Sequence, residues 1–517
     1  MSADLVLTGG KVITMNQAQP YAEAIAIKHD KIVQVGTNEE IKPWIGKNTQ
    51  IIGLKGKTVV PSFIDTHIHV ADFGRLLTWI DLNDAASIKE MQENLSQRVM
   101  KAPKGKWLLG RGWNQTRFAE KRLPTRFDLD AVSPDNPVIF YHQNGQVCLV
   151  NTKALELAGV TRQTAAPAGG AIDRDAKGEL TGVLRDNATN LIWKVIPEPS
   201  EEELMEAAGL ACEKIVEAGV TSVHWMVLSE TELTIIQSLL ARNMLPLRVY
   251  VIIPLDLLDA ATGGSALKVD GVEISADGYL AAKTAALTQP YNDGSEASGK
   301  LLCTQDELNA AAAKILQMGF QLVIHAMGDK AVDAGLTAIE QASKEAPSQK
   351  NARSRIEQAA VLNKELISRL KKREVIVSVQ PCVVASEFSV YSAAEKLGAE
   401  RARRLFPIKT LLKEGVRVVG GSDCPMEPLN PLLGVQAAVT REVFPEERVT
   451  VEEALRMYTT DAAYSSNEEN MKGSVETGKL ADLAVLSRDP FSVPPSETAA
   501  ISVEMTIMGG KVVYSKP

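Results

Sequence analysis

Aromatic residues and cysteines are scarce in this chain of 517 residues. Phe, Trp and Tyr together make up 5% of the sequence, so a folded core has to be built mainly from aliphatic side chains. The five cysteines are odd in number and scattered, and no two have the Cys-X-X-Cys spacing of a thiolate metal site. The sequence therefore indicates neither a disulfide-stabilised fold nor a zinc site built from thiolates.

Basic residues do not exceed acidic ones, and long hydrophobic runs are missing. The formal net charge of −8 argues against a surface that binds nucleic acid. The most apolar window, residues 247–258, is interrupted by Arg248, Pro254 and Asp256 and falls short of the roughly 18 residues that a membrane-spanning helix needs. The first residues lack the basic and apolar regions of a signal peptide. We therefore predict a cytoplasmic protein without a nucleic-acid or membrane partner.

What the chain does contain is enough for a large aliphatic core. Apolar residues make up 45% and charged residues 23% of the sequence, which is the balance of a globular protein rather than a disordered one. A length of 517 residues exceeds one ordinary domain and suits a barrel-sized domain with a smaller partner.

Both ends of the chain have the pattern of short strands joined by tight turns. Near the N-terminus, apolar and polar residues alternate around Gly9-Gly10 and again around His29-Asp30. The pattern returns near the C-terminus, where Gly509-Gly510 also precedes Lys-Val. We predict hairpins at these turns and one small β-sheet domain assembled from residues 1–60 and 470–517.

Between these ends, segments with helical periodicity alternate with buried strand-like runs. The strand-like runs that follow a helix-like segment are VTSVHW, QLVIHAMGD, EVIVSVQP and VRVVGGSD. Such repeated units indicate α/β structure with a parallel sheet, whose closed form over about 400 residues is a (β/α)₈ barrel. We assign residues 61–469 to this TIM barrel. Residues from about 75 to 195 do not follow the alternation, and we expect them to form an insertion over the active-site face.

Histidine and aspartate residues stand at the ends of several predicted strands, where barrel enzymes place their reacting groups. His67 and His69 follow an apolar strand at positions i and i+2, so both imidazoles can face one side and chelate one ion. Later strands end at His325 and at Asp423, whose carboxylate can bind a metal and accept a proton from water. A lone buried histidine is more often a core residue, and a strand-end aspartate can be a helix N-cap. The pairing of His67 with His69 nevertheless predicts a metal site.

An ordered series of motifs resembles the metal-dependent amidohydrolase superfamily, in particular the branch that includes N-substituted formamide deformylase-like enzymes. His-X-His alone is a weak pattern, but the series is highly specific and covers nearly the whole chain. Its members are GGKVITM, PSFIDTHIH, NTKAL, GVTSVH, DGYLAAKTAAL, IHAMGDKAVD, SRIEQA, SVQP, GSDCP and GSVETGKLADLAVLSRDP.

The resemblance implies a (β/α)₈ barrel with a β-sandwich built from both chain ends, in agreement with the pattern above. It also implies one or two divalent metal ions, often zinc, that activate a water molecule to attack an amide or a related bond. His67 and His69 would be metal ligands on the first strand, His325 a ligand on the fifth, and Asp423 both a ligand on the eighth and the general base. A bound metal lowers the pKa of its water to about 7.

Three positions depart from the family pattern. The lysine that usually lies four residues before Asp-Gly is Glu273, whose carboxylate can itself bind or bridge metal ions. The family's Glu-His on the sixth strand is Glu357-Gln358, which replaces an imidazole with a weak amide ligand. In the insertion, the histidine of the family's Asp-Gly-His is Gln146. We therefore expect one tightly held ion, most simply zinc, with a second ion weak or absent.

These departures also predict an altered substrate pocket. Gln146 and Gln358 are candidate substrate contacts because they replace histidines of the family. Trp113 is a candidate because aromatic side chains line small-molecule sites, and His224 because it ends a strand. The alternatives are packing inside the insertion for Trp113 and support of the metal ligands for His224.

The leading functional hypothesis is a metal-dependent hydrolase that acts on a non-peptide carbon–nitrogen bond, such as an N-acyl or N-formyl amide. An esterase, a lactonase or a deaminase would use the same centre, and the fold does not choose between them. A member that binds a small molecule without turnover is the alternative of another class. A homodimer is common in such families, although no segment of this sequence signals an interface.

Overall fold

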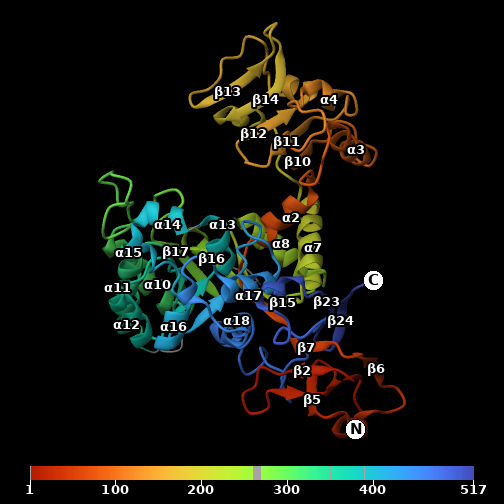
Figure 1. The fold of residues 1–517 in the computed structure, drawn as a ribbon, viewed down its shortest axis with the longest axis vertical. Coiled ribbons are helices and arrows are strands. Elements are labelled where there is room, and N and C mark those ends of the chain that lie inside the picture. The colour runs from red at the N-terminus through yellow and green to blue at the C-terminus, as the bar shows by residue number, and fades with distance from the viewer. Residues whose placement is uncertain (1, 260–268, 348–351, 389) are drawn as a thin grey trace. The chain divides into compact units, whose positions relative to one another are not determined.

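The computed structural model describes residues 2–259, 269–347, 352–388 and 390–517, and the chain divides into two compact units (Figure 1). One unit consists of Met1–Phe73 and Ala208–Pro517, and the other of Gly74–Ala207. The chain passes from one unit to the other within helices α2 (Val70–Thr78) and α7 (Glu201–Glu217).

Eight parallel strands form the barrel of the first unit, in the order β21-β20-β19-β18-β17-β16-β15-β8. They are β8 (Phe63–Ile68), β15 (Val220–Met226), β16 (Arg248–Pro254), β17 (Gly271–Ser275), β18 (Gln321–Ala326), β19 (Arg355–Gln358), β20 (Ile376–Val379) and β21 (Val418–Gly420). A parallel bridge between Ile68 and Cys424 joins the end of β8 to the segment after β21. The expected (β/α)₈ barrel is thereby confirmed.

The strands of the barrel are almost continuous apolar runs because both of their faces are covered. All six residues of β18 are buried, and it lies in sequence between helices α10 (Gln305–Gln317) and α11 (Asp329–Glu345). Helix α10 begins at a capping box formed by Thr304 and Glu307 and ends before Gly319, whose φ is +85°. The other helices of this unit are α1 (Asn38–Ile41), α8 (Glu230–Ala241), α12 (Lys364–Lys372), α13 (Pro381–Glu387), α14 (Val390–Leu397), α15 (Ala399–Ala402), α16 (Ile408–Glu414), α17 (Pro431–Thr440), α18 (Val451–Met457) and α19 (Thr460–Ser465).

Two further sheets combine the ends of the chain into a β-sandwich. The first has the order β5-β4-β1-β6 and the second the order β24-β23-β22-β7-β2-β3. Their strands are β1 (Leu5–Thr8), β2 (Lys11–Ile13), β3 (Tyr21–Ala22), β4 (Ala24–Lys28), β5 (Lys31–Gly36), β6 (Gln50–Gly53), β7 (Thr58–Pro61), β22 (Leu483–Leu486), β23 (Val503–Met508) and β24 (Lys511–Ser515). Leu7, Ile25, Val59, Leu483 and Ile507 are all completely buried in one aliphatic core. The sandwich from both chain ends is confirmed.

The segment Thr58–Ile68 belongs to both parts of this unit. It divides at Ser62 into β7, which pairs with β22 of the sandwich, and β8, which pairs with β15 of the barrel. The buried hydroxyl of Ser62 lies 2.6 Å from the hydroxyl of Thr221 in β15. The strand that carries His67 is therefore a direct continuation of a sandwich strand.

The hairpin predicted at Gly9-Gly10 is wrong. Strand β1 pairs with β4 and β6, whereas β2 pairs with β3 and β7 in the other sheet. The chain crosses between the sheets at Gly10, where a Cβ would lie 2.6 Å from Leu54 Cβ. A glycine pair suits such a crossing as well as a hairpin, so the sequence pattern alone does not separate them. The hairpins at His29-Asp30 and Gly509-Gly510 are confirmed by the antiparallel pairs β4–β5 and β23–β24.

The unit Gly74–Ala207 contains a mixed sheet of order β13-β14-β12-β11-β10-β9. Its elements are β9 (Ile80–Asp81), α3 (Ile88–Val99), β10 (Leu108–Trp113), α4 (Arg126–Asp130), β11 (Val138–His142), β12 (Val147–Val150), α5 (Thr152–Leu157), β13 (Gly170–Arg174), β14 (Leu180–Asp186) and α6 (Asn190–Trp193). It has its own core, in which Met91, Leu95, Phe118 and Phe140 are completely buried. The predicted insertion of about 75–195 falls in this unit, and its expected place over the active-site face stays a prediction.

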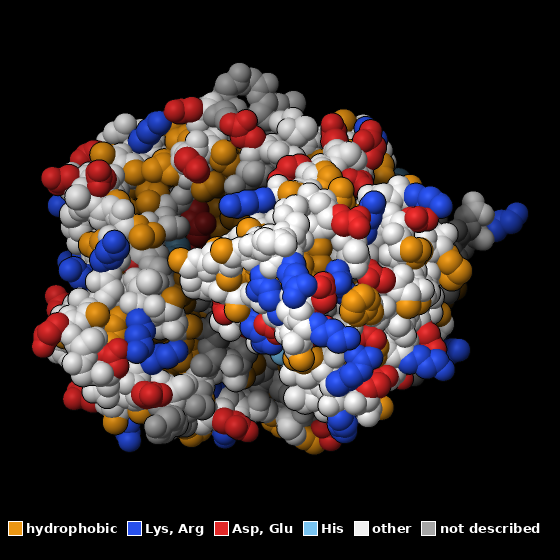
Figure 2. Space-filling model, turned by 90° about the horizontal axis from the view of Figure 1, so that it is seen from above, with side chains coloured by type: hydrophobic (Ala, Val, Ile, Leu, Met, Phe, Trp, Pro, Cys, Tyr) orange, Lys and Arg blue, Asp and Glu red, His pale blue; other side chains and the backbone are white. Residues whose placement is uncertain are grey.

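The described part of the chain includes all five cysteines, and none of them forms a disulfide. No helix within the described ranges is both long and apolar enough to cross a membrane. On the face seen in Figure 2, acidic and basic side chains are interspersed, with hydrophobic side chains among them.

Candidate metal centre

His67, His69 and Asp423 come together at the ends of the first and last barrel strands. His67 lies on β8, His69 follows it, and Asp423 follows β21. The Nε2 atoms of His67 and His69 are 3.6 Å and 3.4 Å from Asp423 Oδ1. The backbone holds this arrangement, since Asp423 N donates to His67 O at 2.8 Å and His69 N donates to Cys424 O at 2.9 Å. One ligand atom from each side chain lies within 4.8 Å of the others, so the three can share one ion.

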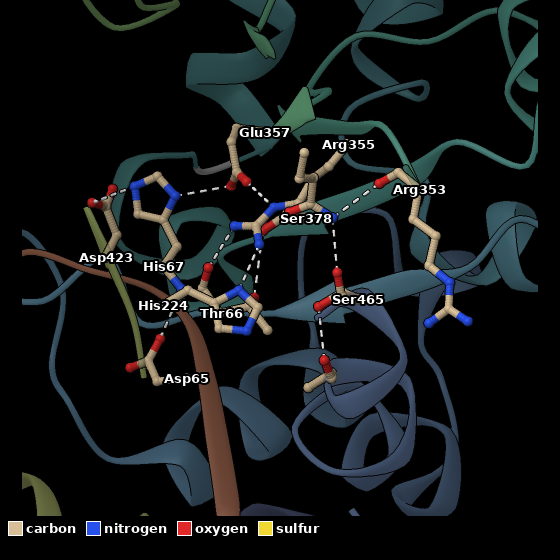
Figure 3. Close-up of polar contacts among 12 residues, drawn as sticks. Asp65, Thr66, His67, His224, Arg353, Arg355, Glu357, Ser378, Asp423 and Ser465 are labelled. Carbon is tan, nitrogen blue, oxygen red and sulfur yellow. Dashed lines mark hydrogen bonds and ion pairs between the residues drawn. The ribbon is translucent and has the colours of Figure 1, made fainter. Parts of the chain in front are cut away.

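Glu357 on β19 fixes the orientation of His67 from the other side of the ring (Figure 3). His67 Nδ1 donates to Glu357 Oε2 at 2.8 Å, so in the neutral ring Nε2 carries no proton and is available to a metal. The other carboxylate oxygen of Glu357 accepts a hydrogen bond from Arg355 Nε. Arg355 and Glu357 are both completely buried, so this ion pair lies in the barrel interior.

Glu357 and His67 shift each other's pKa values inside the barrel. Burial alone would raise the pKa of Glu357, but the charges of Arg355 and His67 bring it below its usual range. Glu357 therefore stays ionised and accepts from both neighbours. Burial opposes protonation of His67, but Glu357 and Asp423 raise its pKa to about 9. A cation at this position is therefore electrostatically favourable, whether it is a proton or a metal ion.

His224 on β15 supports the same network rather than standing apart from it. Its Nδ1 lies 2.7 Å from Arg355 Nη1 and must accept, because a guanidinium only donates. Burial and the charge of Arg355 lower the pKa of His224 well below its usual value, so the ring is neutral. Arg355 also donates to Thr66 O, one residue before His67 (Figure 3). This arrangement favours the supporting role for His224, and its contact with substrate stays a prediction.

His325 on β18 has two buried ring nitrogens without a hydrogen-bond partner among the described residues. Burial lowers the pKa of His325 to about 4, so the imidazole is neutral and can act as a ligand. Its Nδ1 lies 3.9 Å from Asp277 Oδ1. Asp277 in turn accepts from the backbone N–H groups of Met327 and Gly328 at 2.8 Å and 2.9 Å, which fixes the segment after β18.

Glu273 lies on β17, the neighbour of the strand that carries His325. Burial raises the pKa of its carboxyl, and the charges of His67 and His69 act in the opposite direction. Neither Glu273 nor His325 belongs to the tight group of three ligand atoms. Their roles as metal ligands stay predictions.

The donor set suits a divalent transition-metal ion. Two imidazole nitrogens and a carboxylate are donors that zinc binds, whereas magnesium and calcium prefer oxygen alone. The nitrogens of His325 are buried polar atoms without a partner in the described chain, as expected where one of them binds an ion. The residues present therefore fit the metal that the sequence predicts.

The remaining sequence candidates lie in three different settings. Gln358 ends β19 with a φ of +71°, and its Oε1 is buried without a partner in the described chain. Gln146 is exposed in the loop between β11 and β12. Trp113 is completely buried in the core of its unit and donates its indole N–H to Phe140 O at 2.9 Å, which favours the packing role. Substrate contact by any of these side chains stays a prediction.

Gly421 allows the last strand to approach His67 closely. A Cβ at this position would lie 2.7 Å from both Cβ and N of His67. We expect Gly421→Ala to lower the free energy of unfolding by about 1–3 kcal/mol, as overpacking does, and to lower the bound metal by displacing His67. Thermal unfolding and metal content measure the two effects.

Gly209→Ala is the control for Gly421→Ala, because a Cβ at Gly209 meets nothing within 4 Å in helix α7. It should stabilise by about 0.5–1 kcal/mol, and equal metal loss in both variants would contradict the expectation.

Arg355 and the role of Glu357 were not identified from the sequence. The available signal was their spacing, since Arg355 and Glu357 are charged residues at positions i and i+2 of a buried strand. In a barrel strand this period places both side chains on one face, and only mutual pairing makes their burial tolerable.

Comparison with known proteins shows similarity to the amidohydrolase family over most of the chain. A model of the amidohydrolase family matches residues 50–514. The chain is 32% identical to the protein YtcJ of Bacillus subtilis, over 98% of this chain and 99% of that one. It is 31% identical to LONG AFTER FAR-RED 3 of Arabidopsis thaliana, over 99% and 92% of the two chains. It is 28% identical to the N-substituted formamide deformylase of Arthrobacter pascens, over 99% and 98%.

A similar fold has been solved for an uncharacterized metal-dependent hydrolase from Pyrococcus furiosus. The two structures superpose with a TM-score of 0.77 at 29% sequence identity, over 94% of this chain and all of that one. The similarity therefore extends over most of the sandwich, most of the barrel and most of the unit Gly74–Ala207.

Proposed function

Because this chain belongs to the amidohydrolase family, we propose that it is a metal-dependent hydrolase that cleaves a non-peptide carbon–nitrogen bond, in an N-acyl or N-formyl amide. The observation that carries the proposal is the convergence of His67 Nε2, His69 Nε2 and Asp423 Oδ1 at the ends of β8 and β21. Barrel enzymes react at this end of their strands.

The side chains of the centre have separate tasks in this proposal. A divalent ion bound there, most simply one zinc ion, would polarise the substrate carbonyl and lower the pKa of a water molecule. His67, His69 and Asp423 hold the ion, with His325 and Glu273 as further ligands. Asp423 accepts the proton of the attacking water and passes it to the leaving nitrogen. Glu357 keeps the proton of His67 on Nδ1, so that Nε2 remains a ligand.

A single ion is favoured over two by Gln358. Its amide oxygen stands at the end of β19, where the family pattern has an imidazole, and a neutral amide binds transition metals weakly. Glu273 is the residue that would bridge a second ion. The number of ions per chain therefore decides between the two forms of the centre.

Metal content tests the centre directly. We expect about one equivalent of metal per chain after purification without added metal, since a set of nitrogen and carboxylate ligands retains zinc. Plasma mass spectrometry should show this metal lost in His67→Ala and retained in His29→Ala, whose side chain is exposed in the β4–β5 turn. Two equivalents would show that Glu273 bridges a second ion. No metal after incubation with zinc or manganese would rule out the proposed mechanism.

Matched substrates test the bond that is cleaved. N-alkyl formamides and acetamides should be hydrolysed, activity should be lost on chelation, and zinc should restore it. Hydrolysis of the corresponding esters alone would assign an esterase, and release of ammonia from amino heterocycles would assign a deaminase. Binding without turnover of any of them would favour a non-catalytic member. The observation that supports this second candidate is Gln358, whose amide stands where the family pattern has a ligand imidazole.

A further inference from the structure

A pocket of about 300 Å³ lies within the unit Gly74–Ala207. Its lining includes Trp79, Asn83, Arg111, Tyr141 and His142. These residues come from the chain around β9 and from the ends of β10 and β11. None of them belongs to the metal centre, and a pocket of this volume accommodates a small organic molecule.

Arg111 supplies a positive charge that the protein does not neutralise by a direct contact. Two other arginines of this unit pair with carboxylates, Arg185 with Asp173 at 2.6 Å and Arg122 with Asp128 at 2.7 Å. Among the described residues, no carboxylate forms an ion pair with Arg111. Its register neighbour on β9 is Asp81, whose Oδ1 already accepts from the backbone and side-chain N–H groups of Asn83. The guanidinium is therefore available to an external anion.

His142 forms a fixed part of the pocket wall. Its Nδ1 accepts from Asn144 N at 3.1 Å, so in the neutral ring the proton is on Nε2. Nε2 is buried and has no hydrogen-bond partner within the described residues. The ring packs edge-to-face with the buried Trp113 at a centroid distance of 4.7 Å, which holds it in place. His142 therefore contributes ring surface to the pocket, and Arg111 is the donor that faces a ligand.

Aromatic side chains form the apolar wall of the pocket. Trp79 and Tyr141 are nearly parallel, with ring centroids 6.1 Å apart and an interplanar angle of 17°. Trp193 packs edge-on against both of them, at 6.3 Å and 6.4 Å. The three rings support one another, so the two that line the pocket present a pre-organised surface for another planar ring.

We propose that this pocket binds a small carboxylate that carries an aromatic ring. The carboxylate accepts hydrogen bonds from the N–H groups of the Arg111 guanidinium, and the ring lies against Trp79 and Tyr141. The planar fork of N–H donors with one positive charge matches a carboxylate, which only accepts. The site goes beyond the proposed hydrolase function and does not depend on it, because it uses no residue of the metal centre.

Phenylacetate is the probe, titrated into the full-length protein by calorimetry. We expect binding to the wild type and about 10–100-fold weaker binding to Arg111→Gln, the usual effect of removing a charged hydrogen-bonding partner. The matched control is Arg98→Gln, which removes an exposed arginine from helix α3 of the same unit and should leave the affinity unchanged. Phenylacetamide, which has no charge, should bind the wild type more weakly by a similar factor.

Two more variants keep the result interpretable. His69→Ala removes a ligand of the metal centre, so unchanged affinity there places phenylacetate in the second pocket. Arg111→Lys retains the charge without the planar fork and should bind with intermediate affinity, which covers the case in which Arg111→Gln does not fold. The proposal is overturned if the wild type does not bind phenylacetate at millimolar concentration, or if its affinity is lost in His69→Ala and retained in the Arg111 variants.

Discussion

Replacing Asp423 with asparagine is expected to lower kcat by about 10²–10⁴-fold, the contribution of a general base. The substitution retains the size of the side chain but removes the group that accepts the proton. Asp423 has a φ of +59°, and asparagine tolerates this left-handed conformation as aspartate does. Its backbone N–H can still donate to His67 O, so the geometry of the two strands is preserved. Steady-state kinetics on the best amide substrate measure the effect.

Metal content and a second aspartate provide the controls for this variant. His67 and His69 remain in Asp423→Asn but an amide is a weaker ligand than a carboxylate, so kcat is compared at saturating zinc, and turnover lost with the metal bound is a loss of chemistry rather than of the ion. Asp329→Asn alters an aspartate that also follows a barrel strand but accepts hydrogen bonds from Thr288, and it should keep full activity. Unchanged kcat in Asp423→Asn would remove this residue from the mechanism. Ligand binding without turnover in the wild type would instead identify a non-catalytic member.

Glu357→Gln is expected to lower the free energy of unfolding by about 3–5 kcal/mol, because it leaves the completely buried Arg355 without a counter-charge. It should also weaken metal binding by about 10–100-fold, since glutamine accepts from His67 Nδ1 less strongly than a carboxylate does. Chemical denaturation measures the first effect, and competition with a zinc chelator measures the second.

The double variant Arg355→Met with Glu357→Gln isolates the buried charge. Removing both charges leaves none uncompensated, so it should be more stable than Glu357→Gln alone. Glu469→Gln is the matched control, because Glu469 pairs with Arg353 at 2.6 Å in a partly exposed position. Breaking that pair should cost about 1 kcal/mol or less. Equal stability losses in Glu357→Gln and Glu469→Gln would show that the barrel interior does not depend on the Arg355–Glu357 pair.

The barrel was predictable because burial on both faces leaves a distinct apolar pattern in several of its strands. The run QLVIHA between two helical segments is β18, and the start of the helix before it is marked by Thr304 and Glu307. Strand β16 was not identified, although it coincides with the most apolar window, whose breaks at Arg248 and Pro254 are the two ends of the strand. Those breaks argued against a membrane helix without indicating what the segment forms.

The convergence of His67, His69 and Asp423 was predictable because each stands at or just after the end of a buried barrel strand, and their roles as metal ligands stay a prediction. Interactions between strands remote in sequence were not predictable, because a sequence does not record which inward-facing residues meet. Glu357 was considered only as the neighbour of a missing histidine, yet it contacts His67 directly. The identity of Trp113 suggested a binding surface, whereas its complete burial depends on the packing of the whole sheet around it.

The division of Thr58–Ile68 at Ser62 has a consequence for folding during synthesis. Strand β7 can pair early with β2 on one side, and β8 with β15. However, β7 receives its second partner β22 only when the chain has been made beyond Leu486, and β8 is joined to its last neighbour only after Cys424. Contacts of such long sequence separation form late. While the middle of the chain leaves the ribosome, the segment that carries His67 therefore has one hydrophobic edge unpaired, which is open to chaperones and to aggregation. We expect the metal centre to be among the last parts of the protein to form.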